Sequence, residues 1–169
     1  MSVRDILEHP HPVLSRRAAP VTAFDAGLNG VVDDLVDTLA ATPGLGLSAP
    51  QIGASFSAFA LQGLDDDVSL FVNPQILDRA GFCVVEERCL SVPGVSANVF
   101  RAAAIRIRAQ DRAGEVFERE LSGMPAVCFQ HELDHLDGMI FLDRISTVRR
   151  WFATARRKPA QVESITQYD

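Results

Sequence analysis

The segment that most constrains the fold is His131-Glu-Leu-Asp-His135, in which two histidines stand four residues apart. On an α-helix, residues at i and i+4 lie on one face, so the two imidazoles can bind the same metal ion. Pro125 suits the first turn of such a helix and Gly138 suits its end, so we expect a helix between them. Glu132 can accept a proton from water at such an ion. The chain must therefore place this helix where further ligands can reach it.

A third protein ligand is needed, because catalytic sites of this kind usually have three protein ligands and a water. The metzincin pattern would require a histidine where Phe141 stands, so that class is excluded. A thermolysin-like peptidase would take a downstream glutamate as its third ligand, but the only glutamate after His135 is Glu163, near the end of the chain. We therefore expect the third ligand upstream. Cys128 has suitable spacing, but three ligands from one straight helix crowd a tetrahedral ion. Cys89, which lies next to turn-forming residues at the expected end of a strand, is the better candidate.

The rest of the pattern predicts an α+β fold with mixed or antiparallel sheets packed around the metal-binding helix. Residues 25–41 have apolar side chains at helical spacing, and residues 103–110 alternate apolar with polar side chains. Turn-forming residues 111–114 join this second segment to residues 115–121, which indicates an antiparallel hairpin. Shorter β-prone segments lie at 56–61, 70–72 and 83–85. A last helix is expected to begin after Ser146 and to end at Pro159.

Composition limits the possible functions. A chain of 169 residues with 47% hydrophobic residues predicts one domain over residues 1–169, with residues 159–169 as a flexible tail. No apolar stretch approaches the ~20 residues of a membrane span, and early charges interrupt any export signal, so we expect a cytoplasmic protein without a membrane partner. We also expect the protein to be a monomer. The net charge of −6 opposes binding of DNA. Three cysteines, an odd number, favour metal or thiol chemistry over a disulfide framework.

The loop at residues 44–51 is rich in small residues but fits no phosphate-binding or nucleophile motif. It follows a helix instead of a strand, which excludes a dinucleotide fingerprint, and the last glycine of a nucleophile elbow is missing. A tight loop of this kind lets a ligand approach backbone groups, and Gln51 adds an amide donor. A plain structural turn is the other interpretation.

Three motifs together make a specific resemblance. They are Gly44-Leu-Gly-Leu-Ser-Ala-Pro-Gln51, Glu87-Arg-Cys-Leu-Ser91 and Gln130-His-Glu-Leu-Asp-His-Leu-Asp-Gly138, and they resemble, in order and separation, the motifs of the peptide deformylases. The resemblance implies that family's fold and a hydrolase that removes the formyl group from the N-terminal methionine of newly made polypeptides. It also implies one divalent ion on Cys89, His131 and His135, with Fe²⁺ expected in the cell and Ni²⁺, Co²⁺ or Zn²⁺ as substitutes.

The resemblance assigns further roles by position. Catalytic roles fall on Glu132, on the Gln51 side-chain amide and on the Leu90 backbone N–H. Arg101 is expected to pair with Glu87, and Gln130 to orient a metal ligand. Residues expected to contact the N-formyl-methionyl substrate, which should lie as an added strand, are Leu45, Gly46, Glu87, Arg88, Val127 and Cys128.

Two positions depart from the family pattern. Arg88 stands where the second motif has glycine, and Ser48 stands where the first motif usually has alanine. Arg88 brings a long cation to the cleft rim and removes any conformation that only glycine tolerates. Our hypothesis is that Arg88 changes substrate choice. The alternatives to a standard deformylase are a paralogue that acts on another formylated substrate and a metal-binding relative without turnover.

A basic segment follows the metal-binding helix. It holds six of the sixteen positive charges, at Arg144, Arg149, Arg150, Arg156, Arg157 and Lys158. The family's C-terminal helix can dock on ribosomal RNA, so the resemblance implies a salt-sensitive contact with the ribosome. A solvated helix face is the alternative.

Overall fold

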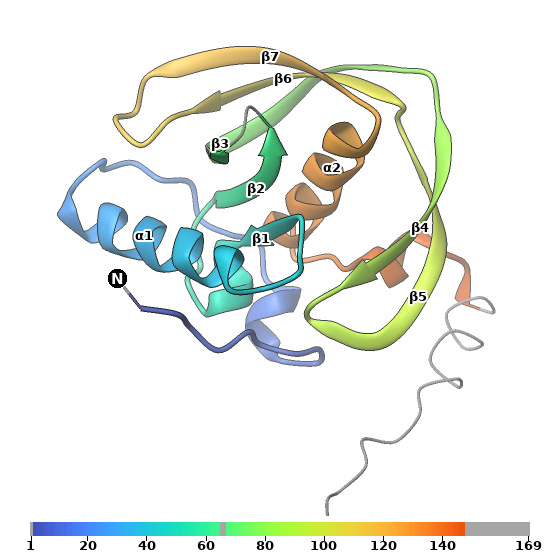
Figure 1. The fold of residues 1–169 in the computed structure, drawn as a ribbon, viewed down its shortest axis with the longest axis horizontal. Coiled ribbons are helices and arrows are strands. Elements are labelled where there is room, and N and C mark those ends of the chain that lie inside the picture. Colours follow the sequence, from blue (N-terminus) through green and yellow to red (C-terminus); the bar gives the residue numbers. More distant parts are fainter. Residues whose placement is uncertain (1, 65–66, 148–169) are drawn as a thin grey trace, which may run out of the picture.

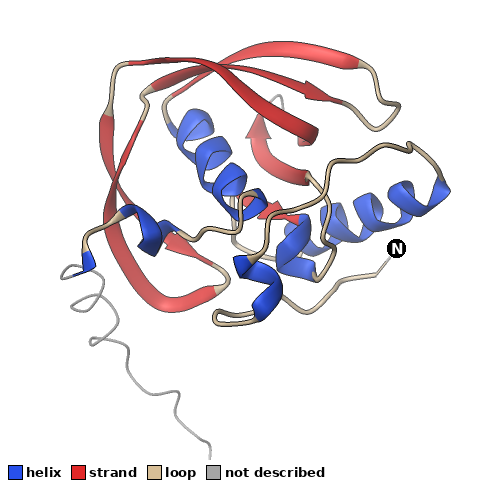
Figure 2. Ribbon diagram, turned by 180° about the vertical axis from the view of Figure 1, so that it is seen from behind, coloured by secondary structure: helices blue, strands red, loops and turns tan. Residues whose placement is uncertain are grey.

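Two antiparallel sheets and two α-helices make up the part of the chain that the computed structural model describes, residues 2–64 and 67–147. Five strands pair in the order β1-β2-β3-β6-β7, and β4 pairs with β5 (Figure 1). The strands are β1 (Gly46–Ser48), β2 (Ala58–Leu64), β3 (Asp67–Ala80), β4 (Cys83–Cys89), β5 (Val92–Arg101), β6 (Ala104–Gln110) and β7 (Val116–Ser122). The helices are α1 (Ala26–Ala40) and α2 (Met124–Leu136), and the 3-10 turns are η1 (Pro12–Ser15), η2 (Ala49–Ile52) and η3 (Phe141–Arg144). The predicted α+β class is confirmed, and all pairings between these strands are antiparallel (Figure 2).

Helix α1 forms where the apolar spacing predicts it. The Asp25 carboxylate accepts hydrogen bonds from the backbone N–H groups of Gly27 and Leu28, at 3.0 and 3.1 Å, and so satisfies two donors at the helix start. Leu35 and Leu39 are fully buried against Leu47 and Ala60 of the larger sheet. One apolar stripe therefore fixes α1 on one face of that sheet.

Helix α2 packs on the opposite face of the same sheet. Phe129 contacts Phe59 and Phe71, with ring centroids 5.0 and 5.2 Å apart. Phe59 and Ala60 are neighbours in β2, and neighbouring residues of a strand point to opposite faces of the sheet. Phe59 therefore packs in the apolar cluster on the side of α2, and Ala60 packs in the apolar cluster on the side of α1. The sheet is thus covered on both sides, and α2 lies at the centre of the molecule (Figure 1).

The hairpin of β6 and β7 follows its predicted turn. Asp111 accepts hydrogen bonds from the backbone N–H groups of Ala113 and Glu115, and Gly114 has φ +87°, a conformation that favours glycine. The strands stay in register from Ala104 opposite Ser122 to Gln110 opposite Val116.

Strands β3 and β4 are longer than the sequence pattern predicts. The segments expected at 70–72 and 83–85 are parts of β3 and β4, and β5 was not expected at all. Pro93 and Gly94, which favour turns, lie within β5, where Gly94 has φ +74°. Because β5 has only β4 as a partner, it can accommodate both residues.

Three predictions concern the end of the chain. The helix expected after Ser146, the basic residues beyond Arg144 and the tail at residues 159–169 lie outside the described residues. Among the described helices, none is long and apolar enough to cross a membrane.

Candidate active site

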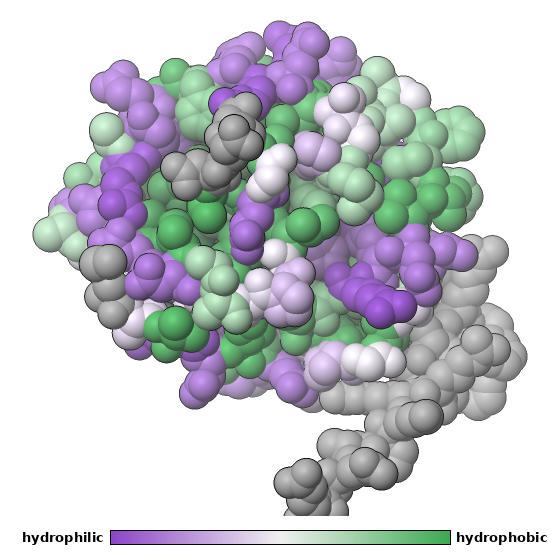
Figure 3. Space-filling model, viewed as in Figure 1, coloured by the Kyte–Doolittle hydropathy of each residue, from purple (hydrophilic) through white to green (hydrophobic). Residues whose placement is uncertain are grey.

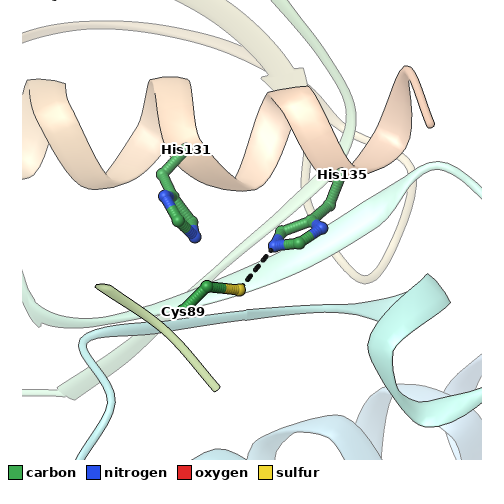
Figure 4. A group of neighbouring side chains, drawn as sticks. All are labelled: Cys89, His131 and His135. Atoms are coloured by element: carbon green, nitrogen blue, oxygen red, sulfur yellow. Dashed lines mark hydrogen bonds between the residues drawn. The ribbon is translucent and has the colours of Figure 1, made fainter. Parts of the chain in front are cut away.

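The three predicted metal ligands meet between α2 and the end of β4 (Figure 4). One ligand atom of each, from Cys89, His131 and His135, lies within 4.8 Å of the other two. Cys89 Sγ is 3.2 Å from His135 Nε2, close to the separation of about 3.5 Å that bond lengths of ~2.3 and ~2.0 Å give two tetrahedral ligands. Cys89 and His135 are buried, and His131 is nearly so. Cys128 is not part of this group, so the structure brings Cys89, and not Cys128, together with the two histidines, as the sequence predicts.

Local pairing explains how β4 presents its cysteine. The register between β4 and β5 shifts between Arg88 and Cys89, and Cys89 then lies opposite Val92. Such an irregularity re-aims a side chain at a strand end. The turn that follows is tied to the N-terminal segment, because the Ser91 carbonyl accepts a hydrogen bond from the His9 N–H at 2.8 Å. The end of β4 that carries the thiol is therefore fixed by its pairing with β5 and, through Ser91, by the N-terminal segment.

The histidines are prepared to bind a metal through one nitrogen each. His131 Nδ1 is 2.8 Å from Glu87 Oε2, which leaves Nε2 for an ion and fixes the ring orientation. Burial lowers the pKa of His135 well below its usual value, so its imidazole is neutral. Burial also opposes a charge on His131, but hydrogen bonds with Cys89 and Glu87 outweigh it and raise the pKa of His131. These donors fit a divalent ion, whose binding displaces a proton from the group.

Behind His131 runs a chain of buried ion pairs. Arg101 donates to both Glu87 oxygens, at 2.6 and 2.9 Å, and to Asp134 at 2.7 Å. Burial opposes the charge on Glu87, but hydrogen bonds from Arg101 and His131 prevail and lower the pKa of Glu87 to about 2. Arg144 Nε adds a bond to Asp134 at 3.0 Å. The predicted pair of Glu87 and Arg101 is confirmed, and it holds the ring of a metal ligand.

Asp134 and Arg144 belong to this chain, although sequence reasoning gave them no role at the site. For Asp134 a signal existed, because His131, Asp134 and His135 stand at i, i+3 and i+4 on one helix face. Arg144 lies in η3, and its place beside Asp134 depends on how the chain returns after α2.

Gln130 does not do what was predicted for it. Its side chain bonds the backbone N–H and carbonyl of Ala102, both at 3.0 Å, and the carbonyl of Ala126 at 2.8 Å. It bonds backbone groups instead of a metal ligand, because residue 130 faces the segment between β5 and β6. Gln130 therefore anchors the residue that follows Arg101 and affects the ligands only through the backbone.

Glu132 lies beside the ligands with one oxygen unsatisfied. Its carboxyl is buried, and Oε2 has no hydrogen-bond partner within the described part of the chain. Burial raises the pKa of Glu132 to about 7, with the charge of His131 acting in the opposite direction. A Cβ added at Gly46 would lie 2.6 Å from Glu132 Oε1, so this glycine of β1 makes room for the carboxyl. A buried carboxyl with this pKa suits a group that takes up and returns a proton near neutral pH.

Gln51 is held by two serines, and all three side chains are buried. Its Oε1 accepts hydrogen bonds from the Ser48 N–H and hydroxyl, both at 2.9 Å. Since the backbone N–H can only donate, these contacts orient the amide so that Nε2 points to Ser91 Oγ at 3.1 Å and to Cys89 Sγ at 3.6 Å. Ser48, the mild departure from the family pattern, and Ser91, which sequence reasoning missed, therefore aim the amide donor at the metal ligands.

A cleft of about 600 Å³ opens onto this group between β1 and β4. Every residue expected to touch substrate lines it: Leu45, Gly46, Glu87, Arg88, Val127 and Cys128, together with Leu90 and Met124. Burial raises the pKa of the Cys128 thiol to about 11, so it stays neutral as part of an apolar wall. Figure 3 shows hydrophobic and hydrophilic residues mixed on the face that carries β1 and β4.

Arg88 occupies ordinary extended backbone within β4. The only described residue other than glycine with positive φ is Asn73. Arg88 therefore does not occupy a backbone conformation reserved for glycine. An effect of Arg88 on substrate choice would have to come from its side chain.

Comparisons with known proteins agree with this site. The family model for polypeptide deformylase matches residues 3–151. The peptide deformylase of Alkalilimnicola ehrlichii is 40% identical over 153 residues, which cover 89% of this chain and 86% of that protein. The crystal structure of a peptide deformylase from Legionella pneumophila has a TM-score of 0.87 and 38% identity, covering 92% of this chain and 93% of that one. A class I type b peptide deformylase from Acinetobacter baumannii bound to Met-Ala-Ser has a TM-score of 0.79 and 30% identity, covering 85% of this chain and 99% of that one. This chain belongs to the polypeptide deformylase family.

Proposed function

We propose that this protein removes the formyl group from N-formyl-methionyl polypeptides and releases formate. The observation that carries the proposal is the buried Cys89, His131 and His135 group with an unsatisfied Glu132 oxygen beside it, at the closed end of a cleft. Family membership and the A. baumannii relative that binds Met-Ala-Ser support the same reaction.

The residues of the site divide the work of amide hydrolysis. A divalent ion on the three ligands supplies positive charge that polarises the formyl oxygen and makes water a stronger acid. Glu132 accepts the proton of the attacking water and passes it to the amine nitrogen that leaves. The Gln51 amide and the Leu90 N–H donate hydrogen bonds to the oxygen that becomes negative, and a donor of this kind is typically worth about 3 kcal/mol. Glu87, held by Arg101, keeps the His131 ring in place.

The lining of the cleft and the strands beside it support an N-formyl-methionyl peptide as the substrate. Leu45, Val127 and Cys128 form an apolar wall suited to the methionine side chain. Among the described strands, β1 and β4 on either side of the cleft each pair with one other strand, which leaves each an edge on which an extended peptide can form backbone hydrogen bonds. Backbone pairing explains how one site can accept many sequences after the methionine.

The metal and the setting of the enzyme are part of the proposal. A thiolate and two imidazoles suit Fe²⁺, Co²⁺, Ni²⁺ and Zn²⁺, and we propose Fe²⁺ in the cell, in line with the family resemblance. Metal analysis of protein purified without oxygen tests this assignment. A monomeric state, a cytoplasmic location, and a contact of the basic C-terminal segment with the ribosome stay predictions.

Formate release from formyl-Met-Ala-Ser by the Ni²⁺-loaded protein tests the reaction. We expect rapid release that falls at least 1000-fold in Glu132→Gln, with one ion per chain in both proteins. Equal activity in the variant would point to a contaminating enzyme. Absence of release from the metal-loaded protein would contradict the proposal and favour the two alternatives, another formylated substrate or a metal-binding relative without turnover.

A further inference from the structure

The outer face of β4 carries two opposite charges at the rim of the cleft. Side chains alternate along the strand: Val85, Glu87 and Cys89 point inward, whereas Val84, Glu86 and Arg88 are exposed. Arg88 is the one lysine or arginine among the described residues that line the cleft.

Neither charge is fully engaged by the protein. The side chains of Arg88 and Glu86 are 77% and 57% exposed, and their nearest charged atoms are 3.9 Å apart, the distance of a loose pair. Glu86 also accepts a hydrogen bond from Ser96 Oγ at 2.7 Å, which holds it toward β5. Both side chains can therefore form ion pairs with charged side chains of a peptide bound as a strand beside β4.

The position of the metal ligands sets the direction of a bound peptide. The formyl end must lie at Cys89, the last residue of β4, and the cleft extends back along β4 as far as Val85. A peptide that leaves the site beside β4 therefore runs antiparallel to it. In an antiparallel pair, advancing two residues on one strand means going back two on the other.

This direction assigns substrate positions to the two charges. If the methionine side chain faces inward, toward Val127 and Cys128, residues 2 and 4 of the peptide face outward. The outward residue of β4 nearest the ligands is Arg88, and the next is Glu86. Residue 2 thus lies beside Arg88 and residue 4 beside Glu86, at the short separation of directly opposite residues.

We propose that Arg88 and Glu86 make this enzyme prefer formylated peptides with an acidic second residue and a basic fourth residue. The inference rests on the proposed deformylase reaction and on peptide binding along β4. Arg88 would thus affect substrate choice at residue 2 of the peptide, and Glu86 at residue 4.

Two isomeric peptides test the pattern: formyl-Met-Asp-Ala-Lys-amide and formyl-Met-Lys-Ala-Asp-amide. They have the same composition and net charge, so the overall negative charge of the protein affects them alike. At low salt we expect kcat/KM for formate release to be about fivefold higher for the first peptide, since opposed cross-strand charges attract and like charges repel. The ratio should shrink toward one in 0.5 M KCl, because salt screens exposed charges.

The decisive variant exchanges the two charges, Glu86→Arg with Arg88→Glu. It keeps the net charge of the protein, and we expect it to prefer the second peptide. The ratio is measured within each enzyme, so any loss of active protein cancels. The matched control exchanges an exposed pair outside the cleft, Arg108→Glu with Glu118→Arg, which lie opposite each other on β6 and β7. This control should keep the ratio of the unchanged protein.

The outcomes separate the two proposals. If neither peptide nor formyl-Met-Ala-Ser releases formate, the proposed function fails. If both isomers are hydrolysed at equal rates, or if the exchange variant keeps the original preference, the function stands and the charge pattern is wrong.

Discussion

The two faces of strand β4 differ in how firmly their side chains are held. On the inner face, Glu87 and Cys89 are buried, and each contacts a histidine of α2. On the outer face, Val84 and Arg88 are exposed, and the ion pair of Arg88 with Glu86 spans 3.9 Å. Alternation along one strand thus separates buried residues at the metal site from exposed residues that we propose face the substrate side chains.

This difference between the two faces of β4 indicates which substitutions the fold tolerates. A buried charge with several partners cannot be altered without leaving one partner unsatisfied, and that is costly. An exposed side chain on an extended strand can change without disturbing the strand. On our proposal, substrate preference can therefore vary at Arg88 and Glu86 while Glu87 and Cys89, their neighbours in the strand, keep the metal site unchanged.

The strongest way to sharpen this comparison is to remove the inner thiol. Cys89→Ala leaves two ligands, so we expect bound metal to fall far below one ion per chain and kcat/KM to fall at least 1000-fold. Metal analysis and formate release measure both effects. Cys83→Ala, at the other end of the same strand and half-buried, is the matched control and should keep its metal. Full metal occupancy in Cys89→Ala would show that Cys89 is not a ligand.

The next effect in size is on stability. Glu87→Gln keeps the shape of the side chain but leaves buried Arg101 with Asp134 as its remaining charged partner. We expect the free energy of unfolding of the metal-free protein to fall by about 3 kcal/mol, measured by urea denaturation. Glu118→Gln removes an exposed partner of Arg108 and should cost less than about 1 kcal/mol. Equal losses in the two variants would contradict the distinction between held and free charges.

The same residue predicts a dependence on pH. The pKa of Glu87 is lowered in the folded protein to about 2 from an ordinary value of 4.5, so its ionised form stabilises the fold. This contribution is complete above pH 4.5 and is lost as the pH falls toward 2. We therefore expect the stability gap between the metal-free unchanged protein and Glu87→Gln to narrow over that interval in urea titrations. A gap that stays constant would mean that the ionisation of Glu87 does not contribute.

The smallest effect is expected on the outer face. Val84→Thr alters an exposed residue that lies opposite exposed Phe100. We expect a change in the free energy of unfolding within about 0.5 kcal/mol, measured by urea denaturation, and kcat/KM within twofold. A loss above 1 kcal/mol would break the comparison, because it would show that this face is packed in solution.

Local signals in the sequence predicted the elements that depend on neighbouring residues. The spacing of His131 and His135 with Pro125 ahead placed α2, and alternation over residues 103–110 placed the β6 and β7 hairpin. Strand β5 was missed because Pro93 and Gly94 favour turns, and only its position beside the single partner β4 makes them tolerable.

Contacts between distant parts of the chain were harder to predict. Turn residues near Cys89 made it the favoured ligand, but the pairing of Glu87 with Arg101 came from the family resemblance. Asp134 joins that pair, and Gln130 bonds to Ala102, because the chain at the end of β5 lies beside α2. Spacing along the chain carries no information about such contacts, which explains why the bonds of Gln130 to Ala102 were not predicted.

The free edges of β1 and β4 also bear on how the protein stays in solution. Unpaired strand edges are where other chains can add and begin to aggregate. Here the two edges line a cleft of about 600 Å³, one strand has only three residues, and the other carries Glu86 and Arg88 beside its open edge. We expect such a cleft to admit a single extended chain end more readily than a folded sheet, because packed sheets are about 10 Å apart face to face. The recess in which we propose that a new polypeptide binds by its first residues would thus also hinder the enzyme from polymerising through its own strands.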